Sequence, residues 1–359
     1  NAGQTAKAIA HLEHAADLEP EHAAHYVALG QAQMAARYHS AAVAAFEQAH
    51  KLEKNQADTL MLLAEAHRRN RDLRQAKHFA LRAAKAAPHA VEPLMLQAEL
   101  ALQEEDGPAA KGLMENALKL TSQHPGALKI LAEALKRMGK YEQAIEILEQ
   151  AQKIAADPLP FLISRAQLIL ESRGQELGRQ ALQNLAERYP DRAEVFVALS
   201  QMLAAAGELH EAIQAAQQAA KQEKGLSAEE SASLQLHLGQ LLKHRGQLDQ
   251  SLHHLDKAVE QAPNLAEAHM ERGRVFLARR QHHAALNAFE MAAKAAPEQA
   301  EPHLEAALAL KEAKDYATAE NELRAAAKLA PKDARVQKQL AAVIALNLVH
   351  KPEGTAVAV

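Results

Sequence analysis

Small and apolar residues recur along the chain with a period of 34 residues. Three prolines mark successive periods near the end of the chain: Pro263, Pro297 and Pro331. Within a period, two stretches carry apolar residues three or four positions apart, which is the spacing of one face of an α-helix. Turn-forming residues, such as those in Met138–Tyr141, separate the two stretches. The pattern therefore predicts pairs of helices joined by short turns, and an all-α fold.

Two positions of the repeat hold a small residue almost throughout. The eighth position reads Gly30, Ala64, Ala98, Ala132, Ala166, Ser200, Gly239, Gly273 and Ala307. The twentieth position reads Ala42, Ala76, Ala110, Ala144, Gly178, Ala212, Ser251, Ala285 and Ala319. Small side chains at two fixed places let the two helices of a repeat approach closely, while larger apolar residues fill the flanking space.

The period divides the chain into nine units with a partial unit at each end. The units span residues 23–331 and begin near residues 23, 57, 91, 125, 159, 193, 232, 266 and 300. An insertion of about five residues, around Lys224–Ser227, displaces the seventh unit. Residues 1–22 match only the second helix of a unit, residues 334–349 predict a capping helix, and residues 350–359 form a tail. We expect that further residues precede Asn1 in the native protein, or that a partner covers this end.

The clearest single unit is marked by Leu131, Ala132, Gly139, Tyr141, Ala144, Leu148 and Ala151. This pattern resembles the tetratricopeptide repeat (TPR), and the resemblance extends over nearly the whole chain. It implies a right-handed superhelical α-solenoid of about nine units with a half unit at each end. The Trp that the family places at the fourth position is absent throughout, so no closer subfamily is assigned.

Composition narrows the classes of function. Aromatic residues are only 3% of the chain and there is no Trp, so the core must be built from Ala and Leu. The absence of Cys excludes disulfides, thiolate zinc sites and thiol catalysis. A net charge of −4 shows no nucleic-acid footprint. No apolar run approaches the length of about 18 residues that a membrane span needs, so we expect no membrane insertion.

The sequence contains no phosphate-binding loop, no HExxH and no GxSxG, so we expect neither a catalytic site nor a cofactor or metal. The twenty histidines are the one compositional anomaly, with close pairs such as His11/His14 and His22/His25. Such pairs are either solvated surface residues or ligands of a divalent metal. Protonation of every His would move the net charge from −4 to +16, which predicts tighter binding of an acidic partner below a pH of about 6.5.

The resemblance implies a partner groove lined by the first helix of each unit. At its lining positions the first four units carry an apolar floor: Val27, Met61, Leu62, Met95, Leu96 and Ile130. Two of these helices add a basic wall: Arg68, Arg69, Lys136 and Arg137. An extended or helical segment with apolar anchors and acidic flanks would suit this half. Packing between first helices is the competing explanation for the floor, and solvated helix ends for the wall.

The later units predict a more acidic groove, through Glu267, Glu271, Glu301 and Glu305. The family's two familiar specialisations are not expected. The Lys and Asn pairs of a carboxylate clamp are missing, and so is an Asn ladder. The helix at 334–349 is apolar on most faces, so it either caps the last unit or offers a docking surface through Val343, Ile344, Leu346 and Leu348.

We therefore expect a non-enzymatic scaffold that holds a partner protein or peptide in its groove. Two alternatives stay open. The chain is a regulatory or docking segment of a larger enzyme or membrane protein, or a homo- or hetero-oligomer that stacks through its end helices. The Ala-, Gln- and His-rich composition favours a bacterial protein, and the family resemblance favours an envelope assembly and the periplasm or cell envelope over the cytoplasm.

Overall fold

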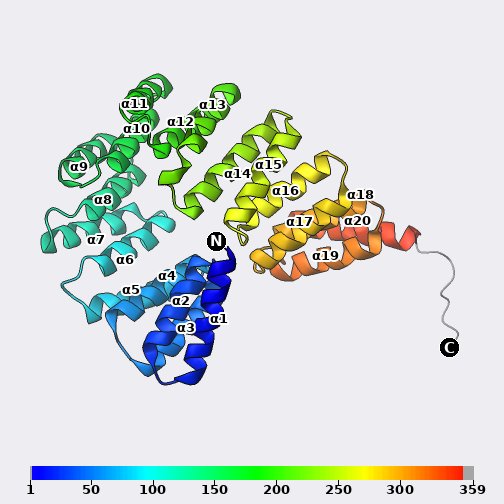
Figure 1. Ribbon diagram of the computed structural model, residues 1–359, viewed down its shortest axis with the longest axis horizontal. Helices are drawn as coiled ribbons and strands as arrows, with labels where there is room; N and C mark the ends of the chain where they lie inside the picture. Colours follow the sequence, from blue (N-terminus) through cyan, green and yellow to red (C-terminus); the bar gives the residue numbers. More distant parts are fainter. Residues whose placement is uncertain (1, 351–359) are drawn as a thin grey trace. The chain divides into compact units, whose positions relative to one another are not determined.

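The computed structural model of the protein describes residues 2–350, so nearly all of the predicted tail lies outside the described residues. The described part of the chain forms twenty α-helices, one short 3₁₀-helix and no strand. It divides into two compact units, Asn1–Gly207 (unit 1) and Glu208–Val359 (unit 2). The division falls in the turn between two helices of the sixth predicted repeat. Figure 1 labels the helices along the chain.

Unit 1 contains α1 (Ala2–Leu18), α2 (Ala23–Ala35), α3 (His39–Leu52), α4 (Ala57–Arg69), α5 (Leu73–Ala86), α6 (Glu92–Gln103), α7 (Gly107–Leu120), α8 (Pro125–Arg137), α9 (Tyr141–Ile154), α10 (Leu159–Arg173), α11 (Gln175–Arg188) and α12 (Ala193–Ala205). Unit 2 contains α13 (Leu209–Lys221), η1 (Glu223–Gly225), α14 (Ala228–His244), α15 (Leu248–Gln261), α16 (Ala266–Ala278), α17 (His282–Ala295), α18 (Glu301–Glu312), α19 (Tyr316–Leu329) and α20 (Ala334–His350).

Helices that are neighbours in the chain pack against each other in both units. The pairs α2/α3, α4/α5, α6/α7, α8/α9 and α10/α11 do so in unit 1, and α14/α15, α16/α17 and α18/α19 in unit 2. We call the first member of a pair its A helix and the second its B helix. Each B helix also contacts the next A helix, as α5 contacts α6 and α17 contacts α18. This stacking of helix pairs confirms the all-α, repeat-based fold.

The small residue at the eighth position sets the distance between the A and B helices. A Cβ atom added at Gly273 would lie 2.3 Å from the Phe289 ring, and one added at Gly30 would lie 2.5 Å from the Phe46 ring. Both Phe side chains are fully buried. The B helix therefore inserts a large side chain where the A helix has none, which is a close ridge-and-groove fit.

The turn between A and B helices repeats one backbone conformation. In most pairs the residue at the fifteenth position of the repeat lies in this turn and has a left-handed φ. The angle is between 59° and 64° at Arg37, Arg71, Glu105, Arg280 and Lys314, and 71° at Gly139. After it, the Asp106 and Asp315 side chains accept hydrogen bonds from the backbone N–H groups of Ala109 and Thr318, at 3.0 and 3.2 Å. These N-caps start the B helix at a fixed residue.

The insertion before the seventh repeat does not form a simple loop. A short 3₁₀ turn, Glu223–Gly225, precedes α14, which begins four residues before the expected position 232. Ser227 and Glu230 form a reciprocal capping box that starts the helix early. The Glu223 carboxylate accepts hydrogen bonds from Gln235 at 2.9 Å and Gln261 at 3.3 Å, so the inserted turn is tied to α14 and α15.

Candidate protein-binding surface

The predicted apolar floor of unit 1 is only partly a surface. Leu96 and Ile130 are core residues, 6% and 8% exposed. Val27, Met61, Leu62 and Met95 are half-buried. Leu96 packs with Leu100 of its own helix, Ala64 of the A helix α4 and Ala80 of the B helix α5. The packing explanation therefore accounts for most of the surface of Leu96 and Ile130, while the four others keep part of their surface open.

A pocket of about 330 Å³ opens on the A helices α6, α8 and α10. Its apolar lining includes Leu102, Ile130, Leu148 and Leu168. Its polar lining consists of Glu99, Lys129, Glu133, Lys136, Ser164 and Gln167. Two of the predicted groove residues, Ile130 and Lys136, thus come together in one concave site.

The α4 half of the predicted basic wall carries its own counter-ion. The Arg68 guanidinium donates two hydrogen bonds of 2.6 Å to the Glu65 carboxylate, and Arg69 donates a third of 2.8 Å. Burial raises the pKa of Glu65, but the hydrogen bonds from Arg68 and Arg69 outweigh burial and leave that pKa below its usual value. A shallow hollow of about 610 Å³ is lined by Arg68, Arg69, Arg71, Leu73 and Gln103.

The α8 half of the wall is paired in the same way. Arg137 donates a 3.1 Å hydrogen bond to Glu133, and the Lys136 ammonium lies 2.7 Å from the Glu171 carboxylate. The sequence contains a signal for these ion pairs that the 34-residue pattern alone does not show. Glu65 and Glu133 stand three and four residues before the basic pairs, which is the spacing of salt bridges on one helix. The four cations are therefore not a free positive surface.

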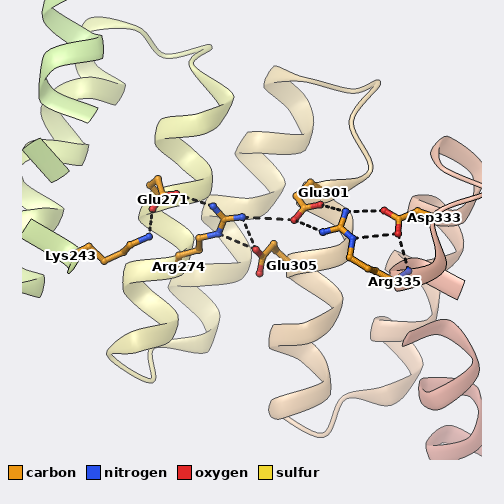
Figure 2. Close-up of polar contacts among 7 residues, drawn as sticks. All are labelled: Lys243, Glu271, Arg274, Glu301, Glu305, Asp333 and Arg335. Atoms are coloured by element: carbon orange, nitrogen blue, oxygen red, sulfur yellow. Dashed lines mark hydrogen bonds and ion pairs between the residues drawn. The ribbon is translucent and has the colours of Figure 1, made fainter. Parts of the chain in front are cut away.

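The predicted acidic groove of unit 2 is likewise neutralised. Figure 2 shows alternating charges across α14, α16, α18 and the start of α20, which we call the charge ladder; its members are Lys243, Glu271, Arg274, Glu301, Glu305, Asp333 and Arg335. Arg274 lies 2.8 Å from Glu271 and 2.8 Å from Glu305. Arg335 lies 3.0 Å from Glu301 and 2.8 Å from Asp333. Outside the ladder, Glu267 accepts a 3.1 Å hydrogen bond from Gln240.

Glu271 is the most deeply buried member of the ladder, with 7% of its side chain exposed. Its two oxygens are shared between the Lys243 ammonium and the Arg274 guanidinium. Burial raises the pKa of Glu271, but these two cations outweigh burial and hold the pKa below its usual value. The carboxylate thus joins α14 to α16, and Arg274 joins α16 to α18.

Several histidines are buried rather than solvated. His67 and His269 are 7% and 2% exposed. Burial is the main cause that lowers the pKa of His67, His237 and His269, and it lowers the pKa of His254 to about 4, helped by the charges of His253 and Lys257. His254 therefore stays neutral at mildly acidic pH, so a charge of +16 is not reached there. No group of three His, Asp or Glu among the described residues could hold a metal ion.

The predicted docking residues of α20 lie in different environments. Val343 is fully buried in the core that α20 shares with Leu310 and Leu323. Ile344 and Leu346 are half-buried, and Leu348 is 68% exposed. Val343 thus anchors the helix, which leaves Leu348 as the most open of the four. Within residues 2–350, no helix has the length and apolar character needed to cross a membrane.

Three family profiles match the sequence. Residues 122–290 match the armadillo-type repeat of tetratricopeptide repeat protein 21, and residues 79–151 match subunit 3 of the anaphase-promoting complex, or cyclosome. Residues 270–334 match a tetratricopeptide repeat profile. The three ranges overlap and together span residues 79–334. No curated protein matches the chain.

Many solved structures are similar to the chain. MamA is 16% identical over 47% of this chain and 96% of its own, with a TM-score of 0.43. Cut9–Hcn1, from an anaphase-promoting complex hetero-tetramer, is 11% identical over 94% of this chain and 81% of its own, with a TM-score of 0.48. The C-terminal part of a TPR repeat-containing protein from Cytophaga hutchinsonii is 15% identical over 68% of this chain and 99% of its own, with a TM-score of 0.48.

The evidence for the family comes from the repeat itself. Helix pairs recur every 34 residues with a small residue at the helix contact, and three profiles of TPR-type repeats match them in succession. The chain belongs to the tetratricopeptide repeat superfamily.

Proposed function

We propose that the protein is a non-catalytic scaffold that holds a segment of a partner protein on the A helices of unit 1. Repeats of this family are protein-interaction modules, so the chain is an interaction scaffold. The pocket on α6, α8 and α10 is the observation that favours unit 1 as the binding site. Concave sites with an apolar floor and a few polar groups are where ligands usually bind.

The charge ladder favours unit 1 over unit 2 for the same role. In unit 2 the polar residues of the A helices are engaged with one another. A partner would have to break those contacts before making its own. In unit 1 the pocket offers apolar surface that needs no such exchange. The anchor of the partner is therefore an apolar or amphipathic side chain.

Site-specific photo-crosslinking in the native source tests this proposal. A photoreactive residue replaces Ser164, which lines the pocket, or Glu146, which is exposed on α9 outside it. We expect a discrete partner adduct from position 164 and none from position 146. Adducts from position 146 alone would place the partner on the B helices and contradict the proposal.

The finer assignments remain predictions. They are membership of a bacterial envelope assembly, a role as the regulatory segment of a larger protein, and stacking through the end helices. Of these, stacking has one supporting observation, because Leu348 and Val349 at the end of α20 are 68% and 79% exposed.

A further inference from the structure

Three consecutive A helices of unit 1 carry a Glu at the ninth position of the repeat: Glu65, Glu99 and Glu133. In α4 and α8 the next turn of the helix supplies two cations, and both pairs bind their Glu. In α6 the same two positions hold Leu102 and Gln103. Glu99 is therefore the one member of the series without a cation on its own helix.

The neighbouring helix does not supply the missing cation either. In unit 2 the ninth-position residue Arg274 meets the second and sixth positions of the next A helix, which are Glu301 and Glu305. The corresponding positions after Glu99 are Gly126 and Ile130. Within residues 2–350, no hydrogen bond or ion pair reaches the Glu99 carboxylate. The nearby Arg68 directs its Nε and Nη2 groups to Glu65.

Glu99 is half-buried, so the absence of a partner has an energetic cost. Burial raises the pKa of its carboxyl group, the nearby Glu65 adds to the rise, and Arg68 and Arg69 oppose it. A carboxylate that loses water without gaining a counter-ion is destabilised. A ligand cation would relieve this cost, and Glu99 lines the pocket where such a ligand would lie.

The rest of the pocket suits the stem of a basic side chain. Leu102, Ile130 and Leu168, which are 9%, 8% and 4% exposed, form part of the apolar lining of the pocket that Glu99 also lines. Arg and Lys bury their methylene groups against such surface while the charged end finds a partner. The planar guanidinium also matches a carboxylate with two parallel hydrogen bonds, as Arg68 shows on Glu65. At about 330 Å³ the pocket is at the small end of ligand sites, which fits a single side chain.

The other charged groups of the pocket do not compete for this role. Lys136 is engaged by Glu171, and Glu133 is engaged by Arg137. Lys129 is exposed and is part of the pocket lining. Its positive charge opposes every incoming cation, so the pocket accepts at most the one basic residue that pairs with Glu99, rather than a basic run.

We infer that this pocket receives an arginine side chain of the partner, with its guanidinium on Glu99 and its methylene groups against Leu102 and Ile130. The inference rests on the proposed function and names the chemistry of the anchor. It replaces the acidic flanks expected from the sequence, because the basic wall that suggested them is paired within the protein. The partner segment therefore carries a single arginine among uncharged residues.

The test uses the whole 359-residue chain with its isoleucine methyl groups labelled for NMR. The Ile130 δ1 methyl is the reporter, assigned by its loss in Ile130→Val. The probe is Nα-acetyl-arginine methylamide, and the control probe is the citrulline analogue, which has the same shape and no charge. We expect a saturable shift of the Ile130 methyl with the arginine probe and a response at least about tenfold weaker with citrulline.

Two variants test whether arginine binding depends on Glu99. Glu99→Gln should weaken arginine binding by about tenfold or more, while the matched Glu146→Gln, exposed on α9, should leave it unchanged. Unchanged positions of the other isoleucine methyls show that the variants are folded. Equal shifts with both probes, or equal arginine binding by Glu99→Gln, would show that the inference is wrong.

Failure of the inference is separable from failure of the proposed function. The adduct from position 164 can be digested and its partner peptide sequenced. A crosslinked peptide without a basic residue would leave the scaffold site in place and reject the arginine anchor. An arginine in that peptide, together with the expected shift of the Ile130 methyl, supports both the scaffold site and the arginine anchor.

Discussion

At the scale of single residues, the turns between helices show how much sequence variation the fold accepts. The left-handed position is filled by Arg, Glu or Lys in five turns and by Gly in three, at Gly139, Gly207 and Gly246. A non-glycine residue there costs roughly 1–2 kcal/mol because its Cβ crowds the following carbonyl oxygen. The repeat tolerates this cost since the backbone bonds of the turn and the burial of both helices hold the conformation.

Two glycine substitutions should have opposite effects on stability. Gly139→Ala places a Cβ on a residue with φ of 71° and should lower the free energy of unfolding by about 1 kcal/mol. Gly112→Ala in the middle of α7 meets no atom within 4 Å and should raise it by about 0.5–1 kcal/mol. Urea unfolding followed by circular dichroism measures both. A stabilised Gly139→Ala protein would contradict the assigned turn geometry.

The sequence predicts some single residues well and others poorly. Small residues at the helix contact follow from the period, because a larger side chain would clash there, as at Gly273. The pairing of Arg68 with Glu65 was available from their spacing. The burial of His67 was not, because nothing in the local pattern marks an imidazole as a core residue. His269 is different, because it stands at the fourth position of the repeat, where the family places its Trp. The isolation of Glu99 emerges only when its helix is compared with α4 and α8.

At the scale of elements, the charge ladder joins the successive A helices α14, α16 and α18 of unit 2. Two steps use a basic side chain that reaches the next A helix, as Lys243 reaches Glu271 and Arg274 reaches Glu305. In the last step Arg335 of α20 reaches back to Glu301 of α18. Glu271 is the step with the least exposure to water. Partly buried pairs are screened less by salt than surface pairs, so this step contributes more than an exposed one.

Replacing the buried carboxylate should weaken unit 2 measurably. Glu271→Gln leaves Lys243 and Arg274 without their shared anion, and we expect a loss of about 1–3 kcal/mol in the free energy of unfolding. Glu312→Gln, at an exposed position on α18, is the matched control and should change stability by less than about 0.5 kcal/mol. Denaturant unfolding compares the two. Equal stability of both variants would mean that the ladder is only a surface arrangement.

Element boundaries show where sequence periodicity stops being informative. Helices follow the period because apolar spacing and turn chemistry agree over most of the chain. The early start of α14 comes from Ser227 and Glu230, whose capping box is a local signal that the period does not contain. The anchoring of the inserted turn through Glu223 depends on Gln235 and Gln261, which lie 12 and 38 residues away in the chain.

At the scale of the whole molecule, buried histidines make folding sensitive to mild acid. His67, His237, His254 and His269 have pKa values lowered by burial from an ordinary value of 6.5, to about 4 for His254. The unfolded chain therefore takes up protons first as the pH falls. Stability that is complete above pH 6.5 is lost progressively as the pH falls toward about 4, where His254 itself becomes charged.

The melting temperature should accordingly fall between pH 7.5 and pH 5. We expect His254→Gln to reduce the size of this fall, because one of the buried titrating groups is removed. His283→Gln changes an exposed histidine of α17 and should not alter the decrease in melting temperature between these two pH values. Thermal unfolding at several pH values gives the comparison. A melting temperature independent of pH over this range would contradict the assigned burial.

The pairing of each helix with its neighbours in the chain has a mechanical consequence. Within each unit the principal contacts join helices that are adjacent or nearly adjacent in sequence. Tension applied along the chain can therefore peel one pair away without disturbing distant ones. Each repeat of 34 residues would release roughly 110–120 Å of extended chain as it unfolds. Such a protein behaves as an extensible tether that lengthens in near-equal steps rather than breaking at a single force.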